Sequence, residues 1–133
     1  RPGMTGSLAP GKARFTSMAP TMVFKNDKPV LLIGAPGGTY IAMGVLQGIL
    51  NALDFGMDAQ QAVSAPRFSA TSDLIEIVNR IPRRTQAALE AEGYQIRRYA
   101  VSYHFAGVHA IRITENGLDG GADPGRDGMA LGL

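Results

Sequence analysis

The sequence contains no cysteine among its 133 residues. It can therefore form no disulfide bond, bind no metal through thiolates and use no cysteine nucleophile, although this absence does not identify a cellular compartment. Histidine is scarce as well, since His104 and His109 are the only two. No pair of carboxylates stands near either histidine at the spacing of metal ligands. We therefore expect no metal and no cofactor, and we expect both histidines to be packed or partly exposed.

A large excess of one charge is also absent. The 13 Lys and Arg residues and 11 Asp and Glu residues give a formal net charge of +2. Such a weak field does not favour nucleic acid or an anionic membrane as a partner. The longest apolar stretch, residues 41–50, is interrupted by Gln47 and is far shorter than the ~20 residues of a membrane-spanning helix. We therefore expect no nucleic-acid partner and no membrane span.

The length and composition fit one globular domain, or one piece of a larger one. Hydrophobic residues make up 45% of the chain, an ordinary fraction for a globular protein. Residues 1–13 are rich in Gly and Pro and lack the apolar core of a signal peptide, so they predict a loop before a globular part at residues 14–133. Because the chain starts with Arg1 and not with an initiator methionine, we expect it to begin within a longer protein.

The first half of the globular part predicts a hairpin and an amphipathic helix. Two apolar runs, residues 21–24 and 29–33, flank the turn-forming sequence KNDK and predict an antiparallel pair of strands. Residues 39–53 follow with helical spacing, and Thr39 is the expected N-cap. The apolar stripe expected to face the core comprises Ala42, Leu46, Ile49, Leu50 and Leu53. The glycines expected to let another element approach this helix closely are Gly44 and Gly48.

The second half alternates between short helices and strands. Capping residues and helix breakers predict one helix from Asp58 to a point before Pro66, and another from Pro82 to Gly93. Apolar runs predict strands at residues 74–78 and 94–99, and the alternation in GVHAIRIT predicts a third. In that third strand, His109, Ile111 and Ile113 share one face. The end of the chain, which reads GLDGGADPGRDGMALGL, predicts turns.

The sequence IGAPGGTYIAMG, residues 33–44, contains the first candidate site, Gly37 and Gly38. Adjacent glycines between a strand and a helix let backbone N–H groups approach a partner, and a helix N-terminus favours negative charge. The partner is then a phosphate, a carboxylate or a reaction oxyanion. No Lys-Ser/Thr follows the glycines and no G-x-G-x-x-G spacing is present, which disfavours a nucleotide. An ordinary tight turn remains open as an interpretation.

Two other groups of polar residues carry weaker signals. Thr16 and Ser17 are adjacent hydroxyls just before a predicted strand, where they either cap a turn or bind a small anion. Asp119, Asp123 and Asp127 recur at every fourth residue, whereas a calcium loop needs ligands at alternate positions and a closing Glu. We therefore interpret the aspartates as turn residues.

Taken together and in order, these segments resemble the C-terminal part of the small subunit of gamma-glutamyltranspeptidases. The resemblance spans nearly the whole chain. Its most specific parts are the hydroxyl pair Thr16-Ser17 before Met-x-Pro-Thr, the Pro-Gly-Gly turn, and the block LDFGMDAQQAVSAPRF.

This resemblance implies an α+β fold, part of an αββα N-terminal nucleophile hydrolase sandwich with antiparallel strands and flanking helices. It also implies a self-cleaving precursor whose new N-terminal Thr is the nucleophile and, through its amine, the base. The glycines that match Gly37 and Gly38 bind the tetrahedral oxyanion, and the hydroxyls that match Thr16 and Ser17 hold the alpha-carboxylate of the donor. The implied reaction cleaves gamma-glutamyl amides such as glutathione and transfers the acyl group to water or an amine. The implied location is periplasmic or secreted.

The implied partners are a large subunit, the missing N-terminal part of the small subunit and a small-molecule gamma-glutamyl substrate. Because residue 1 is Arg and no Thr stands at a processed terminus, the nucleophile is expected upstream, and this chain alone is expected to be inactive. As part of a two-sheet sandwich, the chain alone is expected to expose an apolar face or sheet edge, and either to self-associate or to be only marginally stable. After the glycines, Thr39 and Tyr40 replace the Ser-Arg usual in the best-matched transpeptidases, which leaves a related amidase or acylase open. An anion-binding module and a purely structural domain also remain open.

Overall fold

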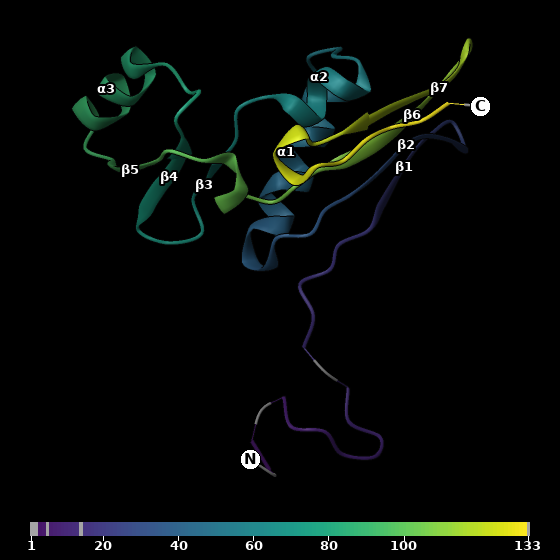
Figure 1. The fold of residues 1–133 in the computed structure, drawn as a ribbon, viewed down its shortest axis with the longest axis horizontal. Helices are drawn as coiled ribbons and strands as arrows, with labels where there is room; N and C mark the ends of the chain where they lie inside the picture. Colours follow the sequence, from purple (N-terminus) through teal and green to yellow (C-terminus); the bar gives the residue numbers. More distant parts are fainter. Residues whose placement is uncertain (1–2, 5, 14, 133) are drawn as a thin grey trace.

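The larger of two β-sheets has four strands in the order β1-β2-β6-β7, and each neighbouring pair is antiparallel. A computed structural model describes residues 3–4, 6–13 and 15–132 of the chain. The strands of this sheet are β1 (Thr21–Lys25), β2 (Lys28–Gly34), β6 (His109–Thr114) and β7 (Gly117–Ala122). The described residues before β1 contain no helix or strand, and Figure 1 shows this segment extending away from the rest of the molecule.

The hairpin of β1 and β2 has the antiparallel pairing that the sequence predicts, but its turn is shorter than KNDK. Lys25 and Lys28 pair with each other, so Asn26 and Asp27 alone form the turn. Both turn residues have positive φ, 51° for Asn26 and 59° for Asp27. Two successive positive φ angles give a turn whose twist matches that of the paired strands, and asparagine and aspartate tolerate this conformation best among non-glycine residues.

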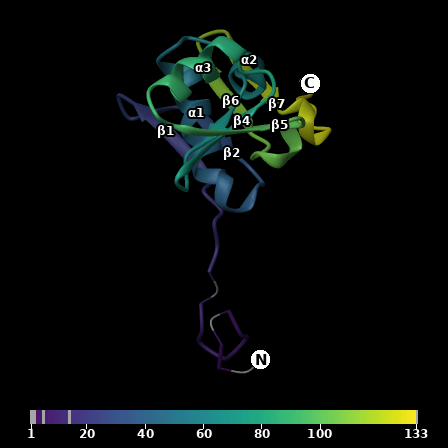
Figure 2. The same ribbon diagram turned by 90° about the vertical axis from the view of Figure 1, so that its left-hand side faces the viewer.

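The smaller sheet has three strands in the order β3-β4-β5. They are β3 (Phe68–Ser69), β4 (Leu74–Val78) and β5 (Gln95–Tyr99), and helix α3 (Arg83–Ala91) connects the last two. This sheet and α3 face the viewer in Figure 2. The α+β class is confirmed and the larger sheet is antiparallel as expected, but β4 and β5 pair in parallel. The crossover helix returns the chain to the end of the sheet from which β4 began, and this imposes the parallel direction.

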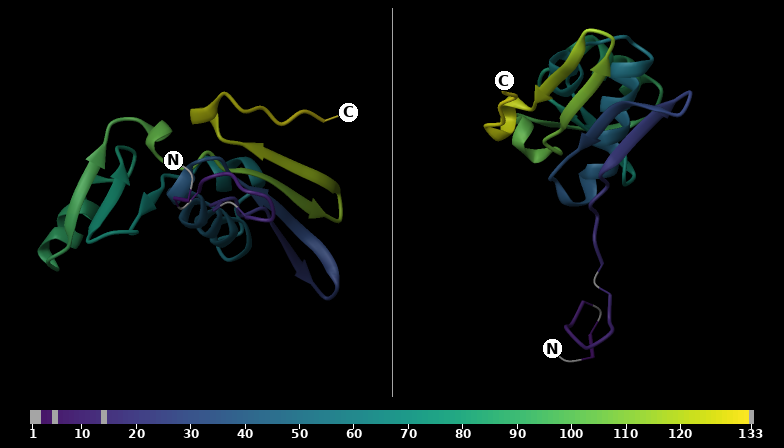
Figure 3. Two further views of the ribbon diagram at one scale, coloured as in Figure 1. Left: turned by 90° about the horizontal axis from the view of Figure 1, so that it is seen from below. Right: turned by 90° about the vertical axis from the view of Figure 1, so that its right-hand side faces the viewer.

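Helices α1 (Ile41–Leu53) and α2 (Ala59–Ser64) cover one face of the larger sheet. The buried core between helices and sheet contains Leu31, Ile33, Ile41, Val45, Ala52, Ala62, Val63, Val108 and Ala110. The other face of the sheet carries the exposed side chains of Met22, Ile111 and Leu118. The C-terminal segment 129–132 runs beside this face in Figure 3 and lines a groove together with it.

The apolar stripe predicted for α1 is wrong, because most of it faces away from the core. Leu46, Leu50 and Leu53 are 47%, 37% and 39% exposed, and Ala42 is exposed as well, whereas Ile49 packs against the core. The residues that α1 buries are Ile41, Gly44, Val45, Gly48 and Ala52.

Close approach at the two glycines of α1 explains which face of the helix is buried. A Cβ at Gly48 would lie 2.6 Å from Ile33 Cδ1, and one at Gly44 would lie 2.8 Å from Ala106 Cβ. The role predicted for Gly44 and Gly48 is therefore confirmed. The sheet selects the face on which its backbone can approach most closely, and that face is lined with small residues instead of leucines.

Two further expectations about local structure differ from the fold. Thr39 is not the N-cap of α1, since a 3₁₀ turn at Gly38–Tyr40 precedes the helix and Tyr40 occupies the cap position without a side-chain capping bond. The predicted turn region after residue 116 contains strand β7. Its Gly121 lies against the backbone of Ala59 in α2, where any side chain would clash. Gly121, one of the glycines that suggested turns, therefore lets a helix pack closely on a strand.

The caps of the other helices follow the sequence closely. Asp58 caps α2 by accepting a hydrogen bond from Gln61 N, while the Gln61 side chain accepts one from Asp58 N. This reciprocal pair satisfies two N–H groups at the start of the helix. Pro82 is the N-cap of α3, and Gly93 ends this helix with a φ of +93°. The predicted starts and ends of both helices are confirmed to within two residues.

Candidate functional site

One end of the larger sheet gathers all the candidate residues. Ile33 pairs with Thr21, Gly34 pairs with His109, and His109 pairs with Ala122. At this end, β1 and β6 begin while β2 and β7 finish. The segments 15–20, 35–40, 104–108 and 123–126 therefore all enter or leave the sheet here. Thr16 and Ser17 lie on the first of these segments, and Gly37 and Gly38 lie on the second.

The Gly37–Gly38 turn requires glycine at both positions, for different reasons. Gly37 has a φ of 146°, and a Cβ there would lie 2.6 Å from Ala106 Cα. Gly38 has a φ of 58° and open space where a side chain would stand. A side chain at position 37 is thus disfavoured both by the backbone conformation and by the lack of space, whereas one at position 38 is disfavoured by the backbone conformation alone. Among the described residues, no hydrogen bond uses the N–H of Gly37 or of Gly38.

Contacts with residues 104–107 hold this turn in place. Gly107 N donates to Pro36 O at 3.0 Å, and Ala106 packs against Gly37. Tyr40 N donates to Gly37 O at 3.1 Å and closes the turn. The two unused N–H groups therefore stand on a backbone that is fixed on both sides, as an anion-binding turn requires.

The hydroxyl pair has one internal contact. Thr16 Oγ1 accepts a hydrogen bond from Met18 N at 3.2 Å, which leaves the hydroxyl proton of Thr16 available to a further acceptor. Ser17 is half-buried, and no hydrogen bond of its side chain is found within the described residues. The fold brings this pair to the same end of the sheet as the glycine turn, and no hydrogen bond joins the two pairs among the described residues.

A cluster that the sequence does not reveal lies beside the glycine turn. Tyr40 Oη donates to Glu76 Oε2 at 2.8 Å and lies 2.9 Å from His104 Nε2. Tyr99 Oη donates to the other carboxylate oxygen, Glu76 Oε1, at 2.7 Å. The His104 ring stacks on Tyr99 with ring centres 3.5 Å apart, and Phe105 lies edge-on to the other rings. Sequence separations of 36 and 64 residues from Tyr40 explain why no local pattern predicts this cluster.

The charge states in this cluster follow from its hydrogen bonds. Burial tends to raise the pKa of Glu76, but the hydrogen bonds from Tyr99 and Tyr40 and the neighbouring His104 outweigh it and hold the pKa below its ordinary value. Burial, together with the hydrogen bond and charge of Glu76, raises the pKa of Tyr40 to about 12. Near neutral pH, Glu76 is thus ionised and Tyr40 is neutral. Since Tyr40 donates its only proton to Glu76, His104 Nε2 must donate to Tyr40 Oη.

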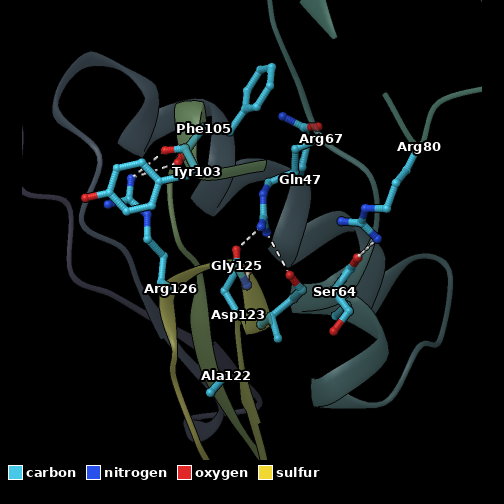
Figure 4. Close-up of polar contacts among 12 residues, drawn as sticks. Gln47, Ser64, Arg67, Arg80, Tyr103, Phe105, Ala122, Asp123, Gly125 and Arg126 are labelled. Carbon is cyan, nitrogen blue, oxygen red and sulfur yellow. Dashed lines mark hydrogen bonds and ion pairs between the residues drawn. The ribbon is translucent and has the colours of Figure 1, made fainter. Parts of the chain in front are cut away.

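A buried ion pair lies on a neighbouring segment at the same end of the sheet. Arg67 and Asp123 bind each other through Nη2 and Oδ2, with side chains that are 5% and 4% exposed. Arg67 Nη1 also donates to Val63 O at 2.8 Å, and Asp123 Oδ1 accepts from Gly125 N at 2.7 Å (Figure 4). Arg126 stacks over the Tyr103 ring in the same view, with the guanidinium carbon 3.9 Å from the ring centre. Arg67, Asp123 and Arg126 each bind other parts of the chain, although Arg126 Nε is buried without a hydrogen-bond partner among the described residues.

The remaining polar candidates have structural contacts too. Asp119 Oδ2 accepts a hydrogen bond from Ala59 N at 2.8 Å, and Asp127 has a left-handed backbone conformation with a φ of 52°. Within the described residues, no group of three His, Asp or Glu side chains could hold a metal ion. None of the helices in the described part of the chain is long and apolar enough to span a membrane.

Comparisons with known proteins agree with this fold. The sequence model of the family described as Gamma-glutamyltranspeptidase matches residues 1–133. The glutathione hydrolase proenzyme of Bacillus subtilis strain 168 is 36% identical over 135 residues, covering 99% of this chain and 23% of that protein. The Acylase ACY 1 proenzyme of Pseudomonas sp. strain SE83 is 37% identical over 134 residues, covering 99% of this chain and 24% of that protein.

Comparison with solved structures also finds gamma-glutamyltranspeptidases. The structure of a mutant gamma-glutamyltranspeptidase from Helicobacter pylori matches with a TM-score of 0.78 and 36% identity, covering 89% of this chain and 66% of that chain. The chain spans about a quarter of the length of the curated relatives that it matches. It carries part of the N-terminal nucleophile hydrolase fold of these relatives, and it belongs to the gamma-glutamyltranspeptidase family.

Proposed function

We propose that this chain supplies the oxyanion-binding turn and the donor-carboxylate contacts of an enzyme that cleaves gamma-glutamyl amide bonds. The observation that carries the proposal is the fixed turn at Gly37 and Gly38, whose two N–H groups have no hydrogen-bond acceptor among the described residues. The relatives named glutathione hydrolase proenzyme support gamma-glutamyl compounds as the substrate class. In this proposal the chain is the C-terminal portion of a small subunit, and its partners are the N-terminal part of that subunit and a large subunit.

The proposed reaction is acyl transfer through a covalent intermediate. The hydroxyl of an N-terminal Thr outside this chain attacks the gamma-carbonyl carbon, and its proton passes to the amine of the same Thr. The carbonyl oxygen becomes an oxyanion that accepts hydrogen bonds from Gly37 N and Gly38 N. The carbon–nitrogen bond then breaks, and the leaving amine takes the proton from the ammonium group. Water or an acceptor amine attacks the resulting ester and regenerates the Thr hydroxyl.

The two pairs of residues act at different stages of this reaction. The N–H groups of Gly37 and Gly38 bind most strongly when the oxyanion carries its full charge, so they lower the barrier to the chemical step. The hydroxyls of Thr16 and Ser17 donate to the alpha-carboxylate of the donor, which carries the same charge before and during the reaction. They therefore contribute to substrate affinity.

A second candidate function is that of an amidase or acylase with a different acyl donor. The identity to Acylase ACY 1 equals that to the glutathione hydrolase of Bacillus subtilis within one percentage point. Tyr40 also replaces the arginine that is usual at this position in the best-matched transpeptidases, so the surroundings of the turn differ there. The chemistry of the turn is the same for both candidates, since any amide forms an oxyanion when attacked.

The test uses the complete protein that contains this chain. We expect the precursor to cleave itself into two polypeptides and then to release the aniline from a gamma-glutamyl anilide. The 133-residue chain alone should release none at any pH, because binding groups cannot replace the attacking nucleophile. A burst of aniline from the isolated chain contradicts the proposal. Cleavage of other acyl amides without cleavage of the gamma-glutamyl anilide supports the second candidate instead.

A further inference from the structure

The side chain of Tyr40 connects the glycine turn to the smaller sheet. Tyr40 ends the 3₁₀ turn that begins at Gly38, so it lies two residues after Gly38 and three after Gly37, the proposed oxyanion donors. Its hydroxyl binds Glu76 of β4 at 2.8 Å and contacts His104 of the β5–β6 connection at 2.9 Å. Glu76 in turn is held by Tyr99 at the end of β5. The Tyr40 hydroxyl thus joins the turn directly to two segments, those of Glu76 and His104, and through Glu76 to Tyr99 on a third.

The surroundings of this hydroxyl make the connection rigid. The Glu76 side chain is 12% exposed, and Phe105, which is 2% exposed, packs edge-on against the rings of Tyr40, Tyr99 and His104. Hydrogen bonds to an ionised carboxylate are stronger than those between neutral groups, particularly when water is largely excluded. The same segment, residues 104–107, also holds the other side of the turn through the bond from Gly107 N to Pro36 O.

We infer that Tyr40 is a positioning residue, whose bond to Glu76 and contact with His104 hold the N–H groups of Gly37 and Gly38 in the geometry that an oxyanion requires. The inference rests on the proposed function of the turn. It assigns to Glu76 and His104, on segments far from the turn in sequence, a role in the rate of the chemical step. Tyr40 acts through the backbone and makes no contact with the reacting atoms.

The test compares Tyr40→Phe with Tyr94→Phe in the complete, processed protein. Tyr40→Phe removes one oxygen atom and keeps the ring packing, and Tyr94 is a 51% exposed tyrosine that serves as the control. We expect Tyr40→Phe to lower kcat per active site by about 10- to 100-fold, since small misplacements of catalytic groups cost rates of this order. KM should stay within about twofold, because substrate contacts are unchanged. Tyr94→Phe should leave both constants unchanged.

Hydrogen exchange provides a readout that does not depend on activity. The backbone N–H groups of Tyr40 and Gly107, which hold the turn by donating to Gly37 O and Pro36 O, should exchange faster in Tyr40→Phe than in the parent protein and in Tyr94→Phe, because the turn has lost its anchor. Glu76→Gln should affect both readouts less in the Tyr40→Phe background than in the parent protein, since the bond between Tyr40 and Glu76 is already absent there. Such non-additivity distinguishes one shared interaction between Tyr40 and Glu76 from two independent contributions to stability.

The outcomes separate this inference from the proposed function. If Tyr40→Phe keeps normal kcat, or raises KM at normal kcat, the positioning role is overturned. If the parent protein cleaves no gamma-glutamyl anilide but cleaves another acyl amide, the same comparison is made on that substrate. If it cleaves no amide at all, the proposed function fails, and unchanged exchange at the N–H groups of Tyr40 and Gly107 in Tyr40→Phe then overturns the anchoring role as well.

Discussion

Arg67 and Asp123 form an ion pair inside the protein, and each side chain is about nineteen-twentieths buried, at 5% and 4% exposure. Burial lowers the pKa of Arg67, although the charge of Asp123 opposes this effect. The pair joins the segment after α2 to the end of β7. The carbonyl of Val63 accepts a hydrogen bond from Arg67 Nη1, and the N–H of Gly125 donates one to Asp123 Oδ1. A charge pair so fully enclosed by hydrogen bonds is sensitive to the loss of either partner.

Arg67→Ala should therefore destabilise the protein by about 3–5 kcal/mol, because the carboxylate of Asp123 remains buried without a counter-charge. Arg83→Ala, at an exposed arginine of α3, is the control and should change stability by less than about 0.5 kcal/mol. The double variant Arg67→Met/Asp123→Leu should recover most of the loss, since no charge stays buried. Chemical denaturation measures the free energy of unfolding of all three variants. Equal stability of Arg67→Ala and Arg83→Ala argues against a structural role for the pair.

The donor role of Gly38 can be tested by replacing its amide N–H with an ester oxygen in the complete protein. Gly38→Pro is unsuitable, because proline fixes φ near −65° whereas Gly38 has a φ of 58°. The ester removes the donor and keeps the freedom of glycine, so kcat should fall by about 10²- to 10³-fold. The same replacement at Gly56, another exposed glycine with positive φ, is the control. Near-normal kcat for the Gly38 ester refutes the oxyanion assignment.

Ser17→Ala should mainly raise KM in the complete protein. The hydroxyl is proposed to bind a carboxylate whose charge does not change during the reaction, so its loss weakens ground and transition states equally. A hydrogen bond to a charged group is worth about 1.5–3 kcal/mol, which corresponds to a rise in KM of roughly 10- to 100-fold. Ser72→Ala, at an exposed serine before β4, is the control. A fall in kcat at unchanged KM speaks against the carboxylate contact.

The isolated 133-residue chain should self-associate through the open face of its larger sheet. Met22, Ile111 and Leu118 on that face are 50%, 42% and 74% exposed, a group of apolar side chains that a monomer in water rarely leaves uncovered. Leu118→Lys should reduce association measured by analytical ultracentrifugation. Leu8→Lys, at a fully exposed leucine outside the sheet, should not. A monodisperse parent chain with a sharp thermal transition contradicts the prediction.

Glu76 should make the stability of the protein depend on pH in acid. Its folded-state pKa lies below the ordinary value of 4.5, so its ionised form stabilises the fold above that pH. This stabilisation is lost as the pH falls through the lowered pKa. The difference in thermal midpoint between the parent protein and Glu76→Gln should thus be constant near neutral pH and shrink below pH 4.5. Glu92→Gln, at an exposed glutamate, is the control. If the difference in thermal midpoint stays constant through acid pH, Glu76 is not the source of the pH dependence of stability.

Much of the local structure was predictable from short patterns. Asp58 and Pro82 mark helix starts, and the hairpin at Asn26 and Asp27 has residues that tolerate positive φ. These features depend on hydrogen bonds and backbone angles among residues close in sequence, so local patterns suffice to find them. The predictions that are wrong concern contacts between residues far apart in sequence. Local patterns do not predict the buried face of α1 or the role of Gly121 in β7, because the sheet and helix that pack against them lie far away in sequence.

The candidate site likewise contains residues that local sequence patterns reveal and residues that meet only in the folded protein. Gly37 and Gly38 could be found from the sequence alone, since adjacent glycines after a strand favour backbone angles that other residues strain to reach, and Thr16 and Ser17 stand just before a predicted strand. That the sheet register brings these pairs to one end of the sheet, and that Tyr40, Glu76 and His104 meet beside them, follows from the folded arrangement alone. The two kinds of feature differ in how far apart in sequence the interacting residues lie. A turn is decided by the angles of a few consecutive residues, whereas a buried carboxylate finds its donors only after distant strands have paired.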